Sequence, residues 1–189
     1  MYDILERFTQ TAALLNGHFV LSSGLHSPTY LQCALALQSP TDANAFAQAI
    51  AEKCGAFEAD AVASPAIGGL VIGFATAQAL GCRFIWTERE NSVMTLRRGF
   101  SATQGERFLV VEDVITTGGS TRECIEALEK AGAKVVAAAS VIDRSNGLAD
   151  VGVPRVSLAT LDVPSYRPEN CPLCKSGTSM TKPGSRPQK

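Results

Sequence analysis

The stretch of sequence that decides the fold is Leu109-Val-Val-Glu-Asp-Val-Ile-Thr-Thr-Gly-Gly-Ser-Thr121. Its apolar start leads into two adjacent carboxylates, and two threonines, two glycines and a Ser-Thr pair follow. Residues 122–131 then carry apolar side chains at helical spacing. This order predicts a buried strand, a loop rich in glycine and hydroxyl groups, and a helix.

The residues of this loop indicate what it binds. Gly118 and Gly119 carry no Cβ, so the backbone can approach a ligand closely. The following helix offers unpaired N–H groups and the positive end of its dipole, which favour a phosphate. Glu112 and Asp113 come at the carboxyl end of the strand, where open α/β sheets bind ligands, and carboxylates can accept hydrogen bonds from a sugar diol. Together these features predict a ribose 5-phosphate ligand.

Other interpretations of this stretch have less support. The chain contains no Gly-x-x-x-x-Gly-Lys-Ser/Thr sequence and no Gly-x-Gly-x-x-Gly sequence after a strand. A Walker-type NTPase and a dinucleotide-binding fold are therefore not supported. An ordinary strand-turn-helix would leave two carboxylates between apolar residues without a ligand, which is costly.

The same residues resemble the phosphoribosyl diphosphate (PRPP) motif of the type I phosphoribosyltransferases. The Thr-Thr-Gly-Gly-Ser form after Glu-Asp is most similar to that of the orotate phosphoribosyltransferases. The similarity extends over about residues 1–175 and includes a Cys-Pro-x-Cys segment of the longer bacterial members. It implies transfer of ribose 5-phosphate from PRPP to N1 of orotate, giving orotidine 5′-monophosphate and pyrophosphate in pyrimidine biosynthesis, with Mg²⁺ as cofactor.

The resemblance also implies roles for individual residues. Backbone N–H groups and hydroxyls of the loop would hold the 5′-phosphate, and the two carboxylates would hold the ribose hydroxyls. Arg144 and Thr116 would orient orotate. The implied catalytic residues are Asp113, Glu112 and Arg89. The implied PRPP-binding residues are Glu112, Asp113, Val114, Ile115, Thr116, Thr117, Gly118, Gly119, Ser120 and Arg89.

A strongly apolar strand is predicted over residues 134–141, and it ends in Ile142-Asp143-Arg144. A buried strand that delivers an arginine to the carboxyl edge of the sheet suits bidentate recognition of a planar carboxylate. Orotate has such a carboxylate. The alternative is an ion pair between Asp143 and Arg144 on the surface.

Residues 88–105 are polar, contain glycines and are basic at Arg89, Arg97 and Arg98. They are predicted to form a long mobile loop, and such loops are usually functional in compact domains. They resemble the catalytic loop of the orotate enzymes, which folds over the active site of the neighbouring subunit in a dimer. Many relatives also carry lysine and histidine there, whereas this chain has Val93 and no Lys or His. Stabilisation of the leaving pyrophosphate is therefore assigned to Arg89; the alternative is a solvated charged hairpin.

A second glycine pair, Gly68-Gly69, follows a short apolar strand over residues 61–64 and begins an apolar helix. In the family this turn binds the pyrophosphate of PRPP. Some relatives carry a lysine in this turn, but this chain has Ile67 and Gly68 there, so any contact is expected from the main chain. The alternative is a glycine pair that allows close helix packing.

At the N-terminus an amphipathic helix is predicted over residues 2–15, ending at Asn16-Gly17. Residues 17–38 alternate short β-like pieces with Ser-Gly and Ser-Pro turns, which predicts a small hood of β-structure. The segment resembles the N-terminal pattern of the orotate enzymes, in which Ser-Gly-x-Lys-Ser-Pro is frequent and the hood covers the base-binding side. His26 occupies the lysine position, either as a ligand contact or as a surface turn histidine.

Two cysteines near the C-terminus form the sequence Cys171-Pro-Leu-Cys174, which has the spacing of half a zinc knuckle. No second Cys or His pair accompanies it, and the two histidines of the chain are far upstream. A reduced structural turn is therefore expected and no metal site is assigned; a zinc site shared across a dimer and a redox pair are the alternatives. Residues 176–189 are predicted to be disordered.

Strands and helices alternate along the chain, which predicts an α/β fold with a mainly parallel sheet flanked by helices, the type I phosphoribosyltransferase fold. With 189 residues, 46% of them hydrophobic and 19% charged, a single soluble domain over residues 1–175 is expected. The net charge of −1 and the lack of basic runs argue against nucleic acid. A cytoplasmic location is expected because no signal peptide or membrane helix is recognisable, and six cysteines are few for a disulfide framework.

Two other functions compete with the orotate enzyme. One is a phosphoribosyltransferase that uses a purine base or uracil, but these bases lack the carboxylate that Arg144 would bind. The other is a regulator that senses PRPP without chemistry. Such regulators usually add a DNA-binding domain, for which the chain shows neither spare length before its first element nor a basic patch. The resemblance to the orotate enzymes implies a homodimer with a shared active-site loop.

Overall fold

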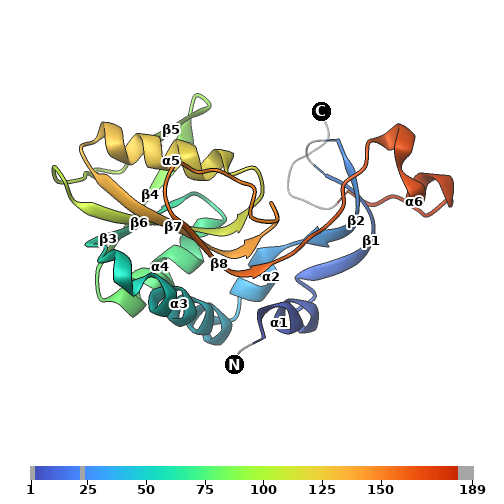
Figure 1. Ribbon diagram of the computed structural model, residues 1–189, viewed down its shortest axis with the longest axis horizontal. Coiled ribbons are helices and arrows are strands. Elements are labelled where there is room, and N and C mark those ends of the chain that lie inside the picture. The colour runs from blue at the N-terminus through green and yellow to red at the C-terminus, as the bar shows by residue number, and fades with distance from the viewer. Residues whose placement is uncertain (1–2, 22–23, 183–189) are drawn as a thin grey trace.

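The computed structural model describes residues 3–21 and 24–182 (Figure 1). Its centre is a six-stranded sheet with the strand order β5-β4-β3-β6-β7-β8. Neighbouring strands are parallel except for the antiparallel pair β4 and β5. The strands are β3 (Ala61–Pro65), β4 (Arg83–Glu90), β5 (Val93–Leu96), β6 (Arg107–Ile115), β7 (Lys134–Asp143) and β8 (Arg155–Thr160).

Helices cover both faces of this sheet. Helices α3 (Pro40–Cys54) and α4 (Gly69–Leu80) lie on one face, and α5 (Gly119–Lys130) lies on the other (Figure 1). A hydrophobic core lies on each face of the sheet, and strand β6 contributes side chains to both because successive side chains of a strand point to opposite faces. Leu109 packs in the core under α3 and α4, and Phe108 packs in the core under α5. The predicted α/β fold with a mainly parallel sheet is confirmed.

Local sequence signals explain why α3 begins where it does. The Ser39 side chain caps the helix by accepting a hydrogen bond from the backbone N–H of Asp42 at 3.3 Å, and Pro40 occupies the first helical position. Phe46 and Ile50 are fully buried on the inner face of the helix. The sequence Ser39-Pro40 therefore accounts for the start of the helix.

The strand order creates a switch point at the centre of the sheet. From β3 the chain passes through α4 to β4 on one side, and from β6 it passes through α5 to β7 on the other. The loops that follow the carboxyl ends of the adjacent strands β3 and β6 therefore lead in opposite directions. Open α/β sheets bind their ligands at such a point.

The N-terminal hood forms a separate two-stranded antiparallel sheet of β1 (Leu14–Val20) and β2 (His26–Leu31), with α1 (Ile4–Gln10) before it and α2 (Cys33–Leu37) after it. The prediction of a helix as far as residue 15 is wrong. Ala12 adopts a φ of +54°, and the backbone N–H of Ala13 donates to the carbonyl of Phe8 at 2.8 Å. The chain thus leaves the helix at a left-handed residue and enters β1.

The C-terminal segment lies beside the hood (Figure 1). This segment contains two short helices, η2 (Pro168–Asn170) and α6 (Pro172–Lys175). Another short helix, η1 (Gly55–Phe57), lies elsewhere in the chain, directly after α3. Residues 176–182, within the predicted tail, run along β1: Thr181 donates its N–H to the carbonyl of His18 at 2.8 Å and accepts from the N–H of Val20 at 3.0 Å. Residues 183–189 of that tail lie outside the described residues. Within the described ranges, no helix has the length and apolar character needed to cross a membrane.

Candidate active site

The carboxylate pair lies at the switch point, within the last four residues of strand β6, Glu112 to Ile115, rather than after the strand. Glu112 is 7% exposed, and Asp113 accepts a hydrogen bond from the backbone N–H of Val114 at 2.8 Å. Burial, and then the neighbouring charge of Asp113, raises the pKa of the Glu112 carboxyl well above its ordinary value. Burial also raises the pKa of Asp113, although the bond from Val114 acts in the opposite direction. A buried and a half-buried acid, both with raised pKa values, at a ligand-binding edge are typical of a functional site.

The raised pKa of Glu112 has a consequence for stability. The folded protein retains a proton that the unfolded chain releases near the ordinary value of about 4.5. The free energy of unfolding therefore falls as the pH rises from that value through the raised pKa.

Glu112→Gln is expected to remove this fall in the free energy of unfolding with rising pH. Above the titration window, the free energy of unfolding should exceed that of the wild type by about 1 kcal/mol while turnover falls, as is common when a strained site is relieved. Urea unfolding at about pH 5 and about pH 8 measures the effect, which should be larger at the higher pH. Glu126→Gln, on the exposed face of α5, is the control. An equal change in stability at both pH values would contradict this assignment.

The loop between β6 and α5 has the backbone that its glycines predict. Gly118 adopts a φ of +75°, and a Cβ there would lie 2.8 Å from a methyl group of Val151, so a larger residue is excluded. Gly118 occupies the N-cap position of α5 and has no side chain to cap the helix; the N–H of Gly119 donates to Oγ1 of Thr117 at 3.4 Å. Thr116, Thr117 and Ser120 are exposed around this helix start. The geometry suits an anion.

Arg122 supports the same loop, which the sequence alone did not indicate. Its Nη1 donates to the carbonyl of Thr117 at 3.0 Å and also to the carbonyl of Asp150. The guanidinium therefore joins the loop after β6 to the segment before β8. Arg122 lies on α5, five residues after Thr117. This spacing is the signal that could have indicated that Arg122 supports the loop.

The second glycine turn packs directly against the carboxylates. A Cβ on Gly68 would lie 2.8 Å from Oδ1 of Asp113, and a Cβ on Gly69 would lie 2.9 Å from the carbonyl oxygen of Val111. Close packing of α4 on β6 therefore requires both glycines, as the alternative interpretation expected. Ile67, at the same turn, is 83% exposed. A main-chain contact between this turn and pyrophosphate stays a prediction.

Arg144 lies beside Thr116, as the sequence predicted. Strands β6 and β7 pair Ile115 with Asp143, and the N–H of Arg144 donates to the carbonyl of Ile115 at 2.8 Å. The two loops that follow therefore begin side by side. Nε of Arg144 is buried and has no hydrogen-bond partner within residues 3–21 and 24–182. Burial lowers the pKa of Arg144, which still leaves an arginine charged at neutral pH.

The alternative surface pair of Asp143 with Arg144 is wrong. Asp143 is 3% exposed and forms an ion pair with Arg155 at 3.1 Å. It also accepts hydrogen bonds from Ser145 and from the N–H of Gly147. Although burial acts to raise it, these bonds hold the pKa of Asp143 below its ordinary value. The Arg144 guanidinium is thus not neutralised by its neighbour in the sequence.

The predicted long loop is partly a hairpin. Strand β4 continues to Glu90, Asn91 and Ser92 adopt φ values of +49° and +68°, and β5 returns from Val93. Two consecutive residues with positive φ between paired strands form a two-residue hairpin turn of the kind that matches strand twist. The prediction of a loop was therefore wrong for residues 88–96, and the alternative of a charged hairpin is correct there. Residues 97–106 contain neither helix nor strand.

The three arginines of this segment form ion pairs. Arg97 contacts Glu90 at 3.2 Å, and Arg98 contacts Glu88. Arg89 forms an ion pair with Glu123 of α5, the helix that follows the phosphate loop. Arg89 is therefore near that helix, and its role in catalysis stays a prediction.

Cys33 of α2 lies against the carboxylate pair and was not indicated by the sequence. It is 2% exposed. Burial, and then the charge of Asp113, raises the pKa of its thiol well above the ordinary value. The end of the hood thus reaches the switch point of the sheet.

His26 is 5% exposed, so its interpretation as a surface turn histidine is wrong. Its Nδ1 lies 2.9 Å from Nε2 of His18, inside the hood. Its predicted contact with a ligand at the lysine position stays untested, and its surroundings are described below.

Comparison with known proteins agrees with this site. The model of the phosphoribosyl transferase domain matches residues 37–161. The orotate phosphoribosyltransferase of Pelotomaculum thermopropionicum is 50% identical over 184 residues, and that of Thermotoga maritima is 48% identical over 184 residues; each alignment covers 97% of both chains. The crystal structure of orotate phosphoribosyltransferase from Aeropyrum pernix has a TM-score of 0.71 at 30% identity, covering 84% of this chain and 94% of that chain. The chain therefore belongs to the phosphoribosyltransferase family and, within it, to the orotate phosphoribosyltransferases.

Proposed function

We propose that this chain transfers ribose 5-phosphate from PRPP to N1 of orotate, releasing pyrophosphate and forming orotidine 5′-monophosphate. One observation carries the proposal: three features lie at the carboxyl ends of neighbouring parallel strands. They are the buried Glu112 with the half-buried Asp113, a helix start whose N-cap, Gly118, has no side chain, and Arg144, whose buried Nε has no hydrogen-bond partner in the described part of the chain. These groups match a ribose diol, a phosphate and the carboxylate of orotate in turn.

The proposed reaction needs no nucleophilic side chain. As the bond to pyrophosphate breaks, positive charge develops on the ribosyl ring and negative charge develops on the leaving group. Glu112 and Asp113 hold the ribose hydroxyls and favour the positive charge on the ring. The loop from Thr116 to Ser120 holds the 5′-phosphate, and Arg144 orients orotate so that N1 faces the reacting carbon. The hairpin arginine Arg89 would stabilise pyrophosphate after leaving its ion pair with Glu123.

Mg²⁺ is the proposed cofactor, and the donors at this edge of the sheet fit it. Glu112 and Asp113 supply the hard oxygen atoms that Mg²⁺ prefers, and this ion is usually held by one or two carboxylates together with substrate phosphates. When bound, it would supply positive charge that offsets the charge of the departing pyrophosphate.

A homodimer is also proposed. An apolar groove of about 540 Å³ lies between α3, α4 and β4, and on α4 the side chains of Val71 and Phe74 are 48% and 62% exposed. Exposed apolar groups gathered on one helix are typical of a surface that another chain covers, and we assign it to a second copy of this chain. Light scattering of the purified protein should give twice the mass of one chain; a monomer would contradict the assignment.

The cytoplasmic location stays a prediction from the sequence.

The proposed reaction is tested by following the orotate absorbance band on mixing the protein with orotate, PRPP and Mg²⁺. Hypoxanthine, adenine and uracil serve as parallel acceptors. We expect orotate to be consumed only when both PRPP and Mg²⁺ are present. Consumption of another base instead of orotate would favour a different acceptor, and tight PRPP binding without turnover of any base would favour a PRPP sensor.

A further inference from the structure

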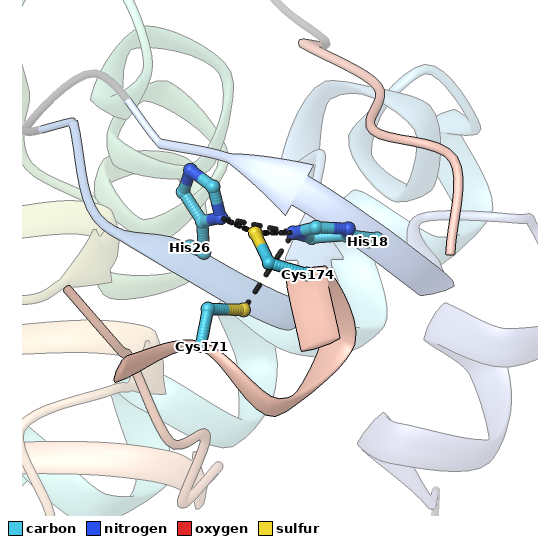
Figure 2. A group of neighbouring side chains, drawn as sticks. All are labelled: His18, His26, Cys171 and Cys174. Carbon is cyan, nitrogen blue, oxygen red and sulfur yellow. Dashed lines mark hydrogen bonds between the residues drawn. The ribbon is translucent and has the colours of Figure 1, made fainter. Parts of the chain in front are cut away.

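Four side chains from opposite ends of the chain converge in the hood (Figure 2). His18 and His26 come from the paired strands β1 and β2. Cys171 is the N-cap residue just before α6, and Cys174 lies within this helix. One nitrogen from each histidine and the two sulfurs all lie within 4.8 Å of one another. Figure 2 shows the four side chains pointing toward a common centre.

The separations are close to the edge lengths of a tetrahedron of ligands around a metal ion. His18 Nε2 lies 2.9 Å from His26 Nδ1, and Cys174 Sγ lies 3.2 Å from His26 Nδ1. Cys171 Sγ and Cys174 Sγ lie 3.6 Å and 3.7 Å from His18 Nε2. Zn²⁺ bonds of about 2.0–2.1 Å to nitrogen and about 2.3 Å to sulfur place tetrahedral ligands roughly 3.3–3.8 Å apart. The cluster is therefore near the required size, and ordinary side-chain adjustment covers the difference.

Hydrogen bonds alone do not account for the arrangement. His18 Nδ1 lies 2.8 Å from the carbonyl oxygen of Thr178, and a carbonyl can only accept, so Nδ1 carries the proton. Nε2 is then left with a single lone pair. Three potential donors, from His26, Cys171 and Cys174, face that one acceptor. A cation at the centre uses a lone pair from every member of the cluster instead.

The contact with Thr178 has a second consequence. Metal-bound histidines usually donate their other ring N–H to a carbonyl or carboxylate, which fixes the tautomer and the orientation of the ring. Thr178 provides this partner for His18. His18, His26 and Cys171 are 2%, 5% and 0% exposed, so three of the four ligand positions are already shielded from water, whereas Cys174 is exposed.

Two imidazoles and two thiolates in a tetrahedral arrangement select zinc among the common cellular metals. Four protein ligands leave no open position for a water or a substrate, which is the pattern of a structural site rather than a catalytic one. We propose that His18, His26, Cys171 and Cys174 bind one Zn²⁺ that fixes the C-terminal segment to the hood.

The position of the cluster explains what such an ion would stabilise. The hood sheet has two strands, and a two-stranded sheet is marginally stable alone. The C-terminal segment adds backbone pairs on both sides, between His26 and Tyr166 and between Thr181 and β1. A Zn²⁺ ion between these pairs would join strands near residue 20 to a helix near residue 172, closing a long loop of chain.

The test begins with the metal content of the full chain purified from zinc-supplemented medium without added chelator. We expect inductively coupled plasma mass spectrometry to find about one Zn²⁺ per chain. Replacing the metal with Co²⁺ should produce the visible absorption bands of a tetrahedral site with thiolate ligands. Wild-type protein that retains no zinc and shows no such Co²⁺ bands would overturn the proposal.

A pair of matched variants tests the ligands. Cys174→Ser removes a ligand on an exposed residue, whereas Cys82→Ser changes a partly exposed cysteine just before β4. Cys174→Ser should lower zinc affinity by roughly 100-fold or more, and Cys82→Ser should leave it unchanged. Equal zinc affinity in wild type and Cys174→Ser would overturn the proposal. A Cys171–Cys174 disulfide in metal-free protein purified without reductant would overturn it in favour of a redox pair.

Thermal unfolding provides a measurement that does not depend on activity. A zinc chelator should lower the melting temperature of the wild type by several degrees and should leave that of Cys174→Ser unchanged. An identical chelator effect on both proteins would contradict the site. None of these measurements involves PRPP or orotate, so they stand apart from the proposed reaction.

Discussion

Replacing Asp113 with asparagine is expected to lower kcat by roughly a hundredfold or more while the protein stays folded. The substitution keeps the size of the side chain and an oxygen that can still accept from the N–H of Val114. It removes the negative charge that the proposed mechanism places beside the ribosyl ring. Because the buried carboxyl already has a raised pKa, its removal relieves a cost of folding rather than adding one.

Steady-state rates at saturating PRPP and orotate measure this effect, and circular dichroism melting checks the fold. Asp162→Asn changes an exposed carboxylate after β8 and serves as the control, with unchanged kinetics expected. If Asp113→Asn retained the wild-type kcat, the charge role of Asp113 would be refuted. A loss of activity that followed a loss of folded protein would reassign Asp113 to structure.

Arg144→Ala is expected to raise the KM for orotate by roughly a hundredfold, because truncating one partner of a buried charge pair commonly costs several kcal/mol. The KM for PRPP should change far less. The Nε atom of Arg144 is buried and has no hydrogen-bond partner in the described part of the chain, so a planar carboxylate would supply the missing acceptor. Arg144→Lys keeps the charge but loses the paired donors, and an intermediate effect is expected.

Initial rates measured while one substrate is varied at saturation of the other separate the two KM values. Lys134→Ala, at the exposed start of the same strand, is the control for the sheet. An equal rise in both KM values would count against recognition of a carboxylate by Arg144. A larger rise in the KM for PRPP would place this arginine on the phosphates instead.

The parts of the site that the sequence predicted depend on local signals. Around Asp113, the local sequence of strand residues, carboxylates, glycines and helix residues determines the backbone conformation of the segment. Gly118 adopts the left-handed conformation that such a loop needs. Ser39 and Pro40 mark the start of α3 in the same way. The apolar run into Arg144 predicted its place beside Thr116, because adjacent parallel strands end at one edge of the sheet.

Local signals failed where unusual residues took positive φ values. Alanine carries no signal for a left-handed helix end, so the stop at Ala12 could not be predicted. Asn91-Ser92 is a weaker turn signal than Asn-Gly, and the charged residues around it suggested a loop. Ion pairs such as that between Arg89 and Glu123 depend on tertiary packing, which spacing along the chain does not reveal.

The His-Cys cluster shows the same limit over a longer range. His18 and Cys171 are 153 residues apart in the sequence, and each half has an ordinary interpretation alone. Two backbone bridges between the C-terminal segment and the hood, antiparallel at Tyr166 and parallel at Thr181, bring them together. The Cys-x-x-Cys spacing left a zinc site open as an alternative, but the two histidines that lie beside the cysteines could not be located from spacing.

The most direct test of the central claim is identification of the products formed from PRPP and orotate. Phosphorus NMR and mass spectrometry of a completed reaction with Mg²⁺ measure both products at once. We predict orotidine 5′-monophosphate and pyrophosphate in equal amounts, with none formed when orotate or PRPP is left out. Release of pyrophosphate with free ribose 5-phosphate and no nucleotide, or the absence of any product, would contradict the proposed transfer.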